Sequence, residues 1–108
     1  LAQEQVEEMV PLPADFTGDG ELFMLRVRGE SMIDAGILDG DFIVASVQSR
    51  VANGDIVIAG IPGDEATVKT FRRRDGKLWL IPHNPAFSPI DGDHATILGK
   101  VTAVLRRI

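Results

Sequence analysis

Hydrophobic residues in this chain gather in short runs that are separated by turn residues. Six runs rich in β-branched or large apolar residues predict strands, over residues 22–28, 42–47, 56–61, 67–71, 78–81 and 96–106. Glycine, asparagine and aspartate lie between the runs, as in Asn53-Gly54-Asp55 and Asp75-Gly76, and these residues favour turns. The pattern therefore predicts a mainly β protein, with compact twisted sheets and short helical or 3-10 turns.

The first twenty residues do not follow this pattern. They are acidic and interrupted by prolines and glycines, which predicts an extended leader or linker end, with at most a short helical piece around residues 3–9. Residues 21–108 are expected to form one domain, because a chain of 108 residues that is 44% hydrophobic can bury a single core. No apolar run approaches the roughly eighteen residues of a membrane span, and no secretory signal is visible, so we expect a cytoplasmic protein.

The charge is distributed unevenly along the chain. Residues 1–41 carry ten acids and two arginines, residues 42–108 carry nine bases and six acids, and the formal net charge is −5. A pI near 4.8 argues against binding of this chain to the phosphate backbone of a nucleic acid, because that contact needs clustered lysine and arginine. The one basic cluster, residues 72–74, precedes Asp75-Gly76 and is interpreted as the solvated end of a hairpin.

The absence of cysteine limits the chemistry, because it excludes disulfides, thiolate nucleophiles and sulfur-ligated metals. A nucleophile would have to be an oxygen, and Ser31 is the candidate. It comes after the first predicted strand and is the first residue of segment 31–38, which is expected to form one or two helical turns. The free N–H groups at such a start can hold the oxyanion that forms when a carbonyl is attacked. The alternative is that Ser31 merely caps the helix.

Lys69 is the candidate base for Ser31. Alternation places it on one face of its strand with Thr67 and Phe71, although lysine is depleted in strands and seldom buried. A lysine acts as a base near pH 7 only if its pKa falls from about 10.4 to near 7, which costs about 4 kcal/mol, and burial is the obvious cause. Activity should therefore depend on a closed site. The alternative is an edge-strand lysine that prevents aggregation.

Other sites have weaker support in the sequence. His83 and His94 are the only histidines, and nothing in their spacing indicates a Ser-His-Asp triad with Ser31. Asp91, Asp93 and His94 lack the further acidic ligands of a calcium loop and are interpreted as turn chemistry, so no metal and no cofactor is expected. Trp79 is interpreted as a core residue.

Six ordered blocks carry a resemblance to a known family. They are Gly29-x-Ser31-Met32, Ile37-x-x-Gly40-Asp41, Gly54-Asp55-Ile56-Val57, Ala66-Thr67-Val68-Lys69, Pro82-x-Asn84-Pro85-x-Phe87 and Ile97-Leu98-Gly99-Lys100-Val101. Together they resemble the C-terminal domain of the LexA repressor family over about residues 21–107, and such a set of blocks is more specific than any single motif. The resemblance implies the LexA/signal-peptidase-like fold and a serine endopeptidase that cuts its own chain.

The resemblance also implies roles and partners. Ser31 would be the nucleophile and Lys69 the general base, with the backbone N–H groups of Glu30 and Ser31 holding the oxyanion. RecA–single-stranded DNA filaments would stimulate the cleavage and thereby end repression of the SOS response to DNA damage. A homodimer is expected through this domain, with the final strand, residues 101–108, as an edge.

Two features depart from the family pattern. Such repressors are cut at an Ala-Gly or Cys-Gly bond before this domain, and no such dipeptide precedes Ser31, so the cut is expected upstream of Leu1. The winged helix-turn-helix domain that would bind operator DNA is also absent from this chain. Three alternatives remain open: a polymerase accessory protein of the UmuD type with the same dyad, a phage repressor, or a dimerisation module whose dyad is inert.

Overall fold

The computed structural model describes residues 12–18, 20–63 and 65–108, and strands are the main secondary structure among them. Its elements are α1 (Ala14–Thr17), β1 (Leu22–Arg26), the 3-10 turn η1 (Ile33–Ala35), β2 (Phe42–Val47), β3 (Ile56–Gly60), β4 (Ala66–Arg74), β5 (Lys77–Ile81), β6 (Ile90–Asp91) and β7 (Thr96–Leu105). The strands form one antiparallel sheet in the order β1-β2-β7-β3-β4-β5-β6. The predicted mainly β architecture is confirmed.

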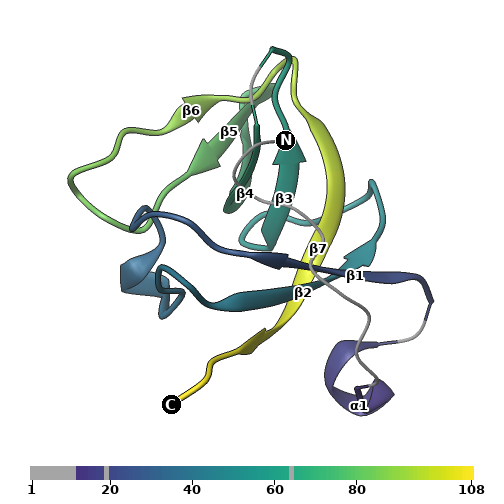
Figure 1. Ribbon diagram of the computed structural model, residues 1–108. Coiled ribbons are helices and arrows are strands. Elements are labelled where there is room, and N and C mark those ends of the chain that lie inside the picture. Colours follow the sequence, from purple (N-terminus) through teal and green to yellow (C-terminus); the bar gives the residue numbers. More distant parts are fainter. Residues whose placement is uncertain (1–11, 19, 64) are drawn as a thin grey trace.

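The long strand β7 joins the two halves of the sheet (Figure 1). Its first half pairs with β3 through residues 96–100, and it pairs with β2 through residues 99–105. The register shifts once against each neighbour, at Val44/Ala45 and at Ile58/Ala59. Because each β-bulge bends its strand, β7 can curve from one half to the other.

Among the described residues, the edge expected over residues 101–108 is found along residues 101–105, although the rest of β7 lies inside the sheet. β7 lies inside the sheet, since β2 and β3 both pair with it. Beyond Lys100, however, its ladder partner within the described residues is β2 alone. Residues 101–105 therefore have one side without a strand neighbour in this part of the chain, and residues 106–108 continue past the strand.

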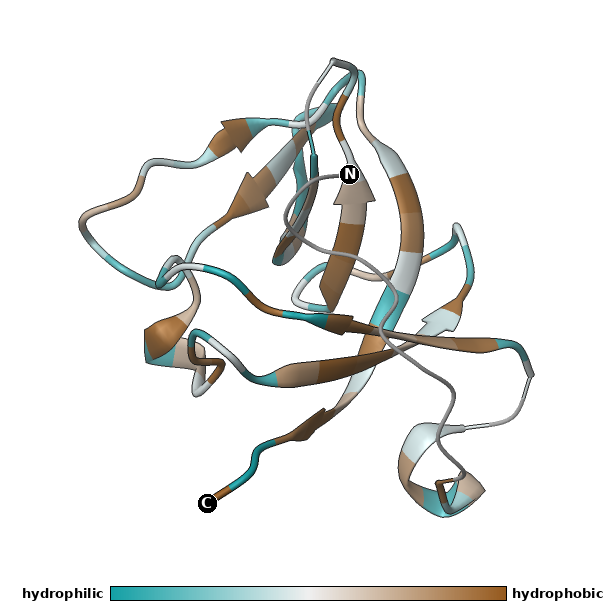
Figure 2. Cartoon of the chain, in the orientation of Figure 1, coloured by the Kyte–Doolittle hydropathy of each residue, from teal (hydrophilic) through white to brown (hydrophobic). Residues whose placement is uncertain are grey.

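Hydrophobic residues form two buried clusters, and Figure 2 shows that β1, β2 and β3 are hydrophobic along most of their length. The first cluster joins β1 and β2 to β3, β4 and the loop after β1; its buried members are Leu25, Val27, Met32, Ile37, Ile43, Ala45, Ile58, Ala66 and Val68. The second is formed by β3, β4 and β5, with Val57, Ala59, Phe71, Leu78 and Leu80. In β4, Ala66 and Val68 belong to the first cluster and Phe71 to the second, so this strand has buried groups on both faces.

Helix α1 falls where the sequence predicted an extended leader. The predicted helical piece at residues 3–9 lies outside the described residues. α1 begins after Pro13, whose backbone is extended, and its Thr17 side chain is fully buried. Tertiary packing beside β2 and β7 therefore gives helical structure to a segment that has little helical signal of its own.

Turn chemistry follows the sequence closely. Asp75 and Gly76 both have positive φ and close the two-residue connection between β4 and β5, as a hairpin requires. Arg72–Arg74 form the exposed end of β4 beside this turn, as expected. Asp91 accepts a hydrogen bond from the Asp93 N–H, which confirms the interpretation of this pair as turn chemistry.

Candidate active site

The side chains of Ser31 and Lys69 meet in the structure, although 38 residues separate them. Lys69 Nζ lies 3.0 Å from Ser31 Oγ, within hydrogen-bonding distance. Ser31 lies in the turn after Gly29, whose φ of 88° is a left-handed conformation that favours glycine. Helix η1 begins after Met32 and has no side-chain cap. The capping interpretation of Ser31 is therefore wrong, and its hydroxyl faces the lysine instead.

Lys69 lies in the interior of the sheet. Its strand, β4, is paired with β3 and β5 on either side, so the edge-strand interpretation is wrong. The residue is 7% exposed, and removal from water disfavours a charged ammonium. Its Nζ also donates to Thr67 Oγ1 at 2.7 Å. Thr67 was not predicted as a site residue, but its place two residues before Lys69 on the same strand face was a usable signal.

The turn carrying Ser31 presents backbone donors. Within the described residues, the N–H groups of Glu30 and Ser31 make no hydrogen bond to the protein. The expected one or two helical turns over residues 31–38 are reduced to the single turn η1. Met32 and Ile37 are each 2% exposed and fix this turn to the first hydrophobic cluster, a burial that contributes about 2 kcal/mol per side chain.

The segment after β5 is hydrogen-bonded through its backbone to the turn that carries Ser31. The His83 N–H donates to the Ser31 carbonyl at 2.7 Å, and the Asp34 N–H donates to the His83 carbonyl at 2.8 Å. The His83 ring turns elsewhere, with Nε2 2.7 Å from Thr70 Oγ1. His83 therefore supports the position of Ser31 without forming a triad with it.

Two aspartates hold the loop between Ser31 and β2. Asp39 Oδ1 accepts from the Gly29 N–H at 2.7 Å, and Asp41 Oδ2 accepts from the Leu38 N–H at 2.8 Å. Arg106, just beyond β7, donates to both Asp41 oxygens at 2.7 Å. The hydrogen bonds from Arg106 lower the pKa of the Asp41 carboxyl below its usual value, against the opposing effect of burial. Sequence reasoning missed this pair, because its members lie 65 residues apart.

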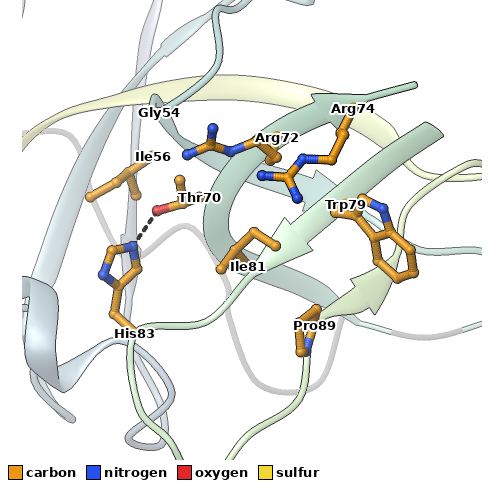
Figure 3. A pocket seen from close by; sticks show the side chains of 9 residues that line it. All are labelled: Gly54, Ile56, Thr70, Arg72, Arg74, Trp79, Ile81, His83 and Pro89. Carbon is orange, nitrogen blue, oxygen red and sulfur yellow. Dashed lines mark hydrogen bonds between the residues drawn. The ribbon is translucent and has the colours of Figure 1, made fainter. Parts of the chain in front are cut away.

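A cavity of about 580 Å³ lies on the other face of β4 (Figure 3). Its lining residues are Gly54, Ile56, Thr70, Arg72, Arg74, Trp79, Ile81, His83 and Pro89. Trp79, interpreted from the sequence as core, is only partly buried and lines this cavity instead. Neither Ser31 nor Lys69 is among the residues that line this cavity.

The described residues contain no cluster of histidine, aspartate and glutamate arranged to hold a metal ion. Lys77 Nζ lies 2.9 Å from a carboxylate oxygen of both Asp91 and Asp93. These hydrogen bonds lower the pKa of Asp93 and contribute to lowering that of Asp91, whose carboxylate accepts the Asp93 N–H. In the described part of the chain, no helix is long and apolar enough to cross a membrane.

Comparison with known proteins supports the resemblance found in the sequence. Residues 1–102 match the Peptidase S24-like family. LexA repressors of Nocardioides sp. and Mycolicibacterium vanbaalenii are 63% and 60% identical over the whole chain, and that of Bifidobacterium longum is 57% identical over 99% of it. The chain spans 44% to 46% of the length of these relatives.

These relatives favour the repressor interpretation over the polymerase accessory protein and the phage repressor. The match to the family covers nearly all of the sheet and both members of the Ser–Lys pair. By sequence and by its antiparallel β architecture, the chain belongs to the Peptidase S24-like family.

Proposed function

We propose that this chain is the self-cleaving and dimerisation domain of a LexA-type repressor, with Ser31 and Lys69 as its catalytic dyad. The observation that carries the proposal is the 3.0 Å approach of a buried lysine to a serine hydroxyl. A weak hydroxyl nucleophile needs such an adjacent base. The identity to LexA repressors supports the biological assignment.

The chemistry follows from these groups. Neutral Lys69 takes the proton of Ser31 as Oγ attacks the carbonyl carbon of an Ala-Gly bond. The N–H groups of Glu30 and Ser31 hold the resulting oxyanion. The lysine then gives its proton to the departing glycine amine, the C–N bond breaks, and an ester on Ser31 remains. Water, deprotonated by the same lysine, hydrolyses that ester and restores the serine.

The partners also belong to this proposal. RecA–single-stranded DNA filaments would stabilise the cleavable conformation, and operator DNA would be bound by a winged helix-turn-helix domain outside this chain. A homodimer would use the side of residues 101–105 that has no strand neighbour among the described residues. Val104, on that segment, is 39% exposed, which leaves apolar surface for a second copy.

The test is self-cleavage of the chain extended upstream through an Ala-Gly bond. Intact mass is followed over time between pH 6 and pH 10, beside Ser31→Ala and Lys69→Ala. We expect one cut, faster at high pH because the neutral amine becomes more abundant, and no cut in either variant. If the extended parent stays whole even with activated RecA, the domain is a dimerisation module and the dyad is inert. Residual cutting by Ser31→Ala would disprove the nucleophile.

A further inference from the structure

The peptide group between Glu30 and Ser31 is fixed by hydrogen bonds to its carbonyl oxygen. Asn84 Nδ2 donates to the Glu30 carbonyl oxygen at 2.9 Å, across 54 residues of sequence. The one other donor to this oxygen among the described residues is the Ile33 N–H, at a long 3.4 Å. The side chain of Asn84 therefore makes the stronger of the two contacts that fix this peptide plane.

The orientation of the Asn84 amide is fixed by a second hydrogen bond. Its Oδ1 accepts from the Ala86 N–H at 3.0 Å. A backbone N–H can only donate, so the oxygen must face Ala86 and the nitrogen must face Glu30. The backbone of the preceding residue, His83, is bound to Ser31 and Asp34. The donor that reaches Glu30 is therefore carried by a segment that is itself held against the turn that carries Ser31.

A planar trans peptide transmits this constraint to the catalytic side. Its C=O and N–H point in opposite directions, and the described chain contains no cis peptide bond. Fixing the Glu30 carbonyl toward Asn84 thus aims the Ser31 N–H the opposite way. That N–H makes no hydrogen bond within the described residues and is one of the two donors assigned to the oxyanion.

We propose that Asn84 is a positioning residue for the oxyanion: its amide fixes the Glu30–Ser31 peptide so that the Ser31 N–H meets the developing negative charge. The proposal rests on the proposed function of Ser31 as nucleophile. Donors act in catalysis only if they already point to where the charge forms, and removing one completely costs roughly 100- to 1,000-fold in rate. Loosening a donor costs less, and we expect about a tenfold loss, the effect of about one hydrogen bond.

The sharpest variant is Asn84→Asp. A carboxylate still accepts from the Ala86 N–H but cannot donate to the Glu30 carbonyl, so it removes only the proposed contact. Asn84→Ala, which is neutral, separates loss of the donor from the added charge. The matched control is Asn53→Asp. Asn53 also donates to a carbonyl, that of Arg73, and accepts that residue's N–H, but at the far end of β4.

Two measurements test the proposal. Self-cleavage of the upstream-extended chain is followed across pH, and binding of a peptidyl boronic acid, which forms a tetrahedral adduct on Ser31, is titrated separately. In both Asn84 variants we expect the alkaline plateau rate and the boronate affinity to fall about tenfold. For Asn84→Ala the pH midpoint should not move, because the base is untouched. Asn53→Asp should match the parent in both assays.

The outcomes distinguish failure of the self-cleavage proposal from failure of the role proposed for Asn84. Unchanged plateau and affinity in Asn84→Asp, with the parent active, overturn the role of Asn84. A parent that binds boronate without cleaving itself overturns self-cleavage, while the boronate series still decides the role of Asn84. A parent that does neither overturns both. A shifted midpoint with an unchanged plateau in Asn84→Ala would mean that the residue acts on Lys69 instead.

Discussion

Replacing Asp41 by asparagine should destabilise the fold by about 2 kcal/mol at pH 7. The Asp41 carboxylate is 2% exposed and accepts two hydrogen bonds from Arg106 and one from the Leu38 N–H. Breaking a fully buried ion pair costs about 3–5 kcal/mol, whereas an exposed pair is worth about 0–1 kcal/mol. The Arg106 side chain is 43% exposed, so the expected loss lies between these ranges.

The dependence of this loss on pH follows from the pKa of Asp41. Arg106 lowers that pKa in the folded chain relative to an unfolded aspartate, whose pKa is about 3.9. A lowered carboxyl pKa stabilises the fold above the unfolded pKa, and this stabilisation is lost as the pH falls through the folded pKa. The difference between parent and Asp41→Asn should therefore be complete near neutral pH and shrink below about pH 4.

Urea unfolding followed by fluorescence measures this difference directly, because Trp79 is the only tryptophan in the chain. For a domain of this size, about 2 kcal/mol corresponds to a fall in Tm of roughly 10 °C. The control is Asp91→Asn, which breaks a pair with Lys77 in which the Asp91 side chain is 61% exposed, and it should not change stability measurably. Equal unfolding midpoints for parent and Asp41→Asn at pH 7, or a gap that stays the same at pH 3, would refute the reasoning.

Three further predictions concern the site, the sheet and the dimer. Thr67→Val removes the hydrogen bond from Lys69 to the Thr67 hydroxyl while keeping a β-branched side chain, and should slow self-cleavage about tenfold without loss of fold; an unchanged rate would show that Thr67 does not contribute to the reaction. Gly99→Ala should destabilise the chain by about 1–3 kcal/mol in thermal unfolding, because the new Cβ would lie 2.8 Å from the Ser46 carbonyl oxygen; a stable variant would mean that β2 and β7 can separate locally. Val104→Lys should weaken dimerisation in analytical ultracentrifugation and leave the monomer folded, whereas an unaltered association would move the dimer interface elsewhere.

The sequence alone determined the strands and singled out Ser31 and Lys69, whose side chains meet in the structure. Short apolar runs and turn residues reflect local conformational preference, so they predicted every long strand to within a few residues and the hairpin at Asp75-Gly76. Alternation along its strand placed Lys69 on a face with Phe71, and both residues are buried. The ordered blocks around Ser31 and Lys69 predicted the family, because residue identities in a fixed order can be recognised before the fold is known.

Only the tertiary structure decided what each candidate residue touches. Whether Lys69 lay at an edge or inside the sheet depended on strand order, which pairs residues far apart in sequence. Helix α1 forms through packing, and the contacts of Asp41 with Arg106 and of Asn84 with Glu30 join segments separated by 65 and 54 residues. No local preference encodes such contacts, because they exist only after the chain has closed on itself. The geometry around Ser31 is therefore a product of the whole fold.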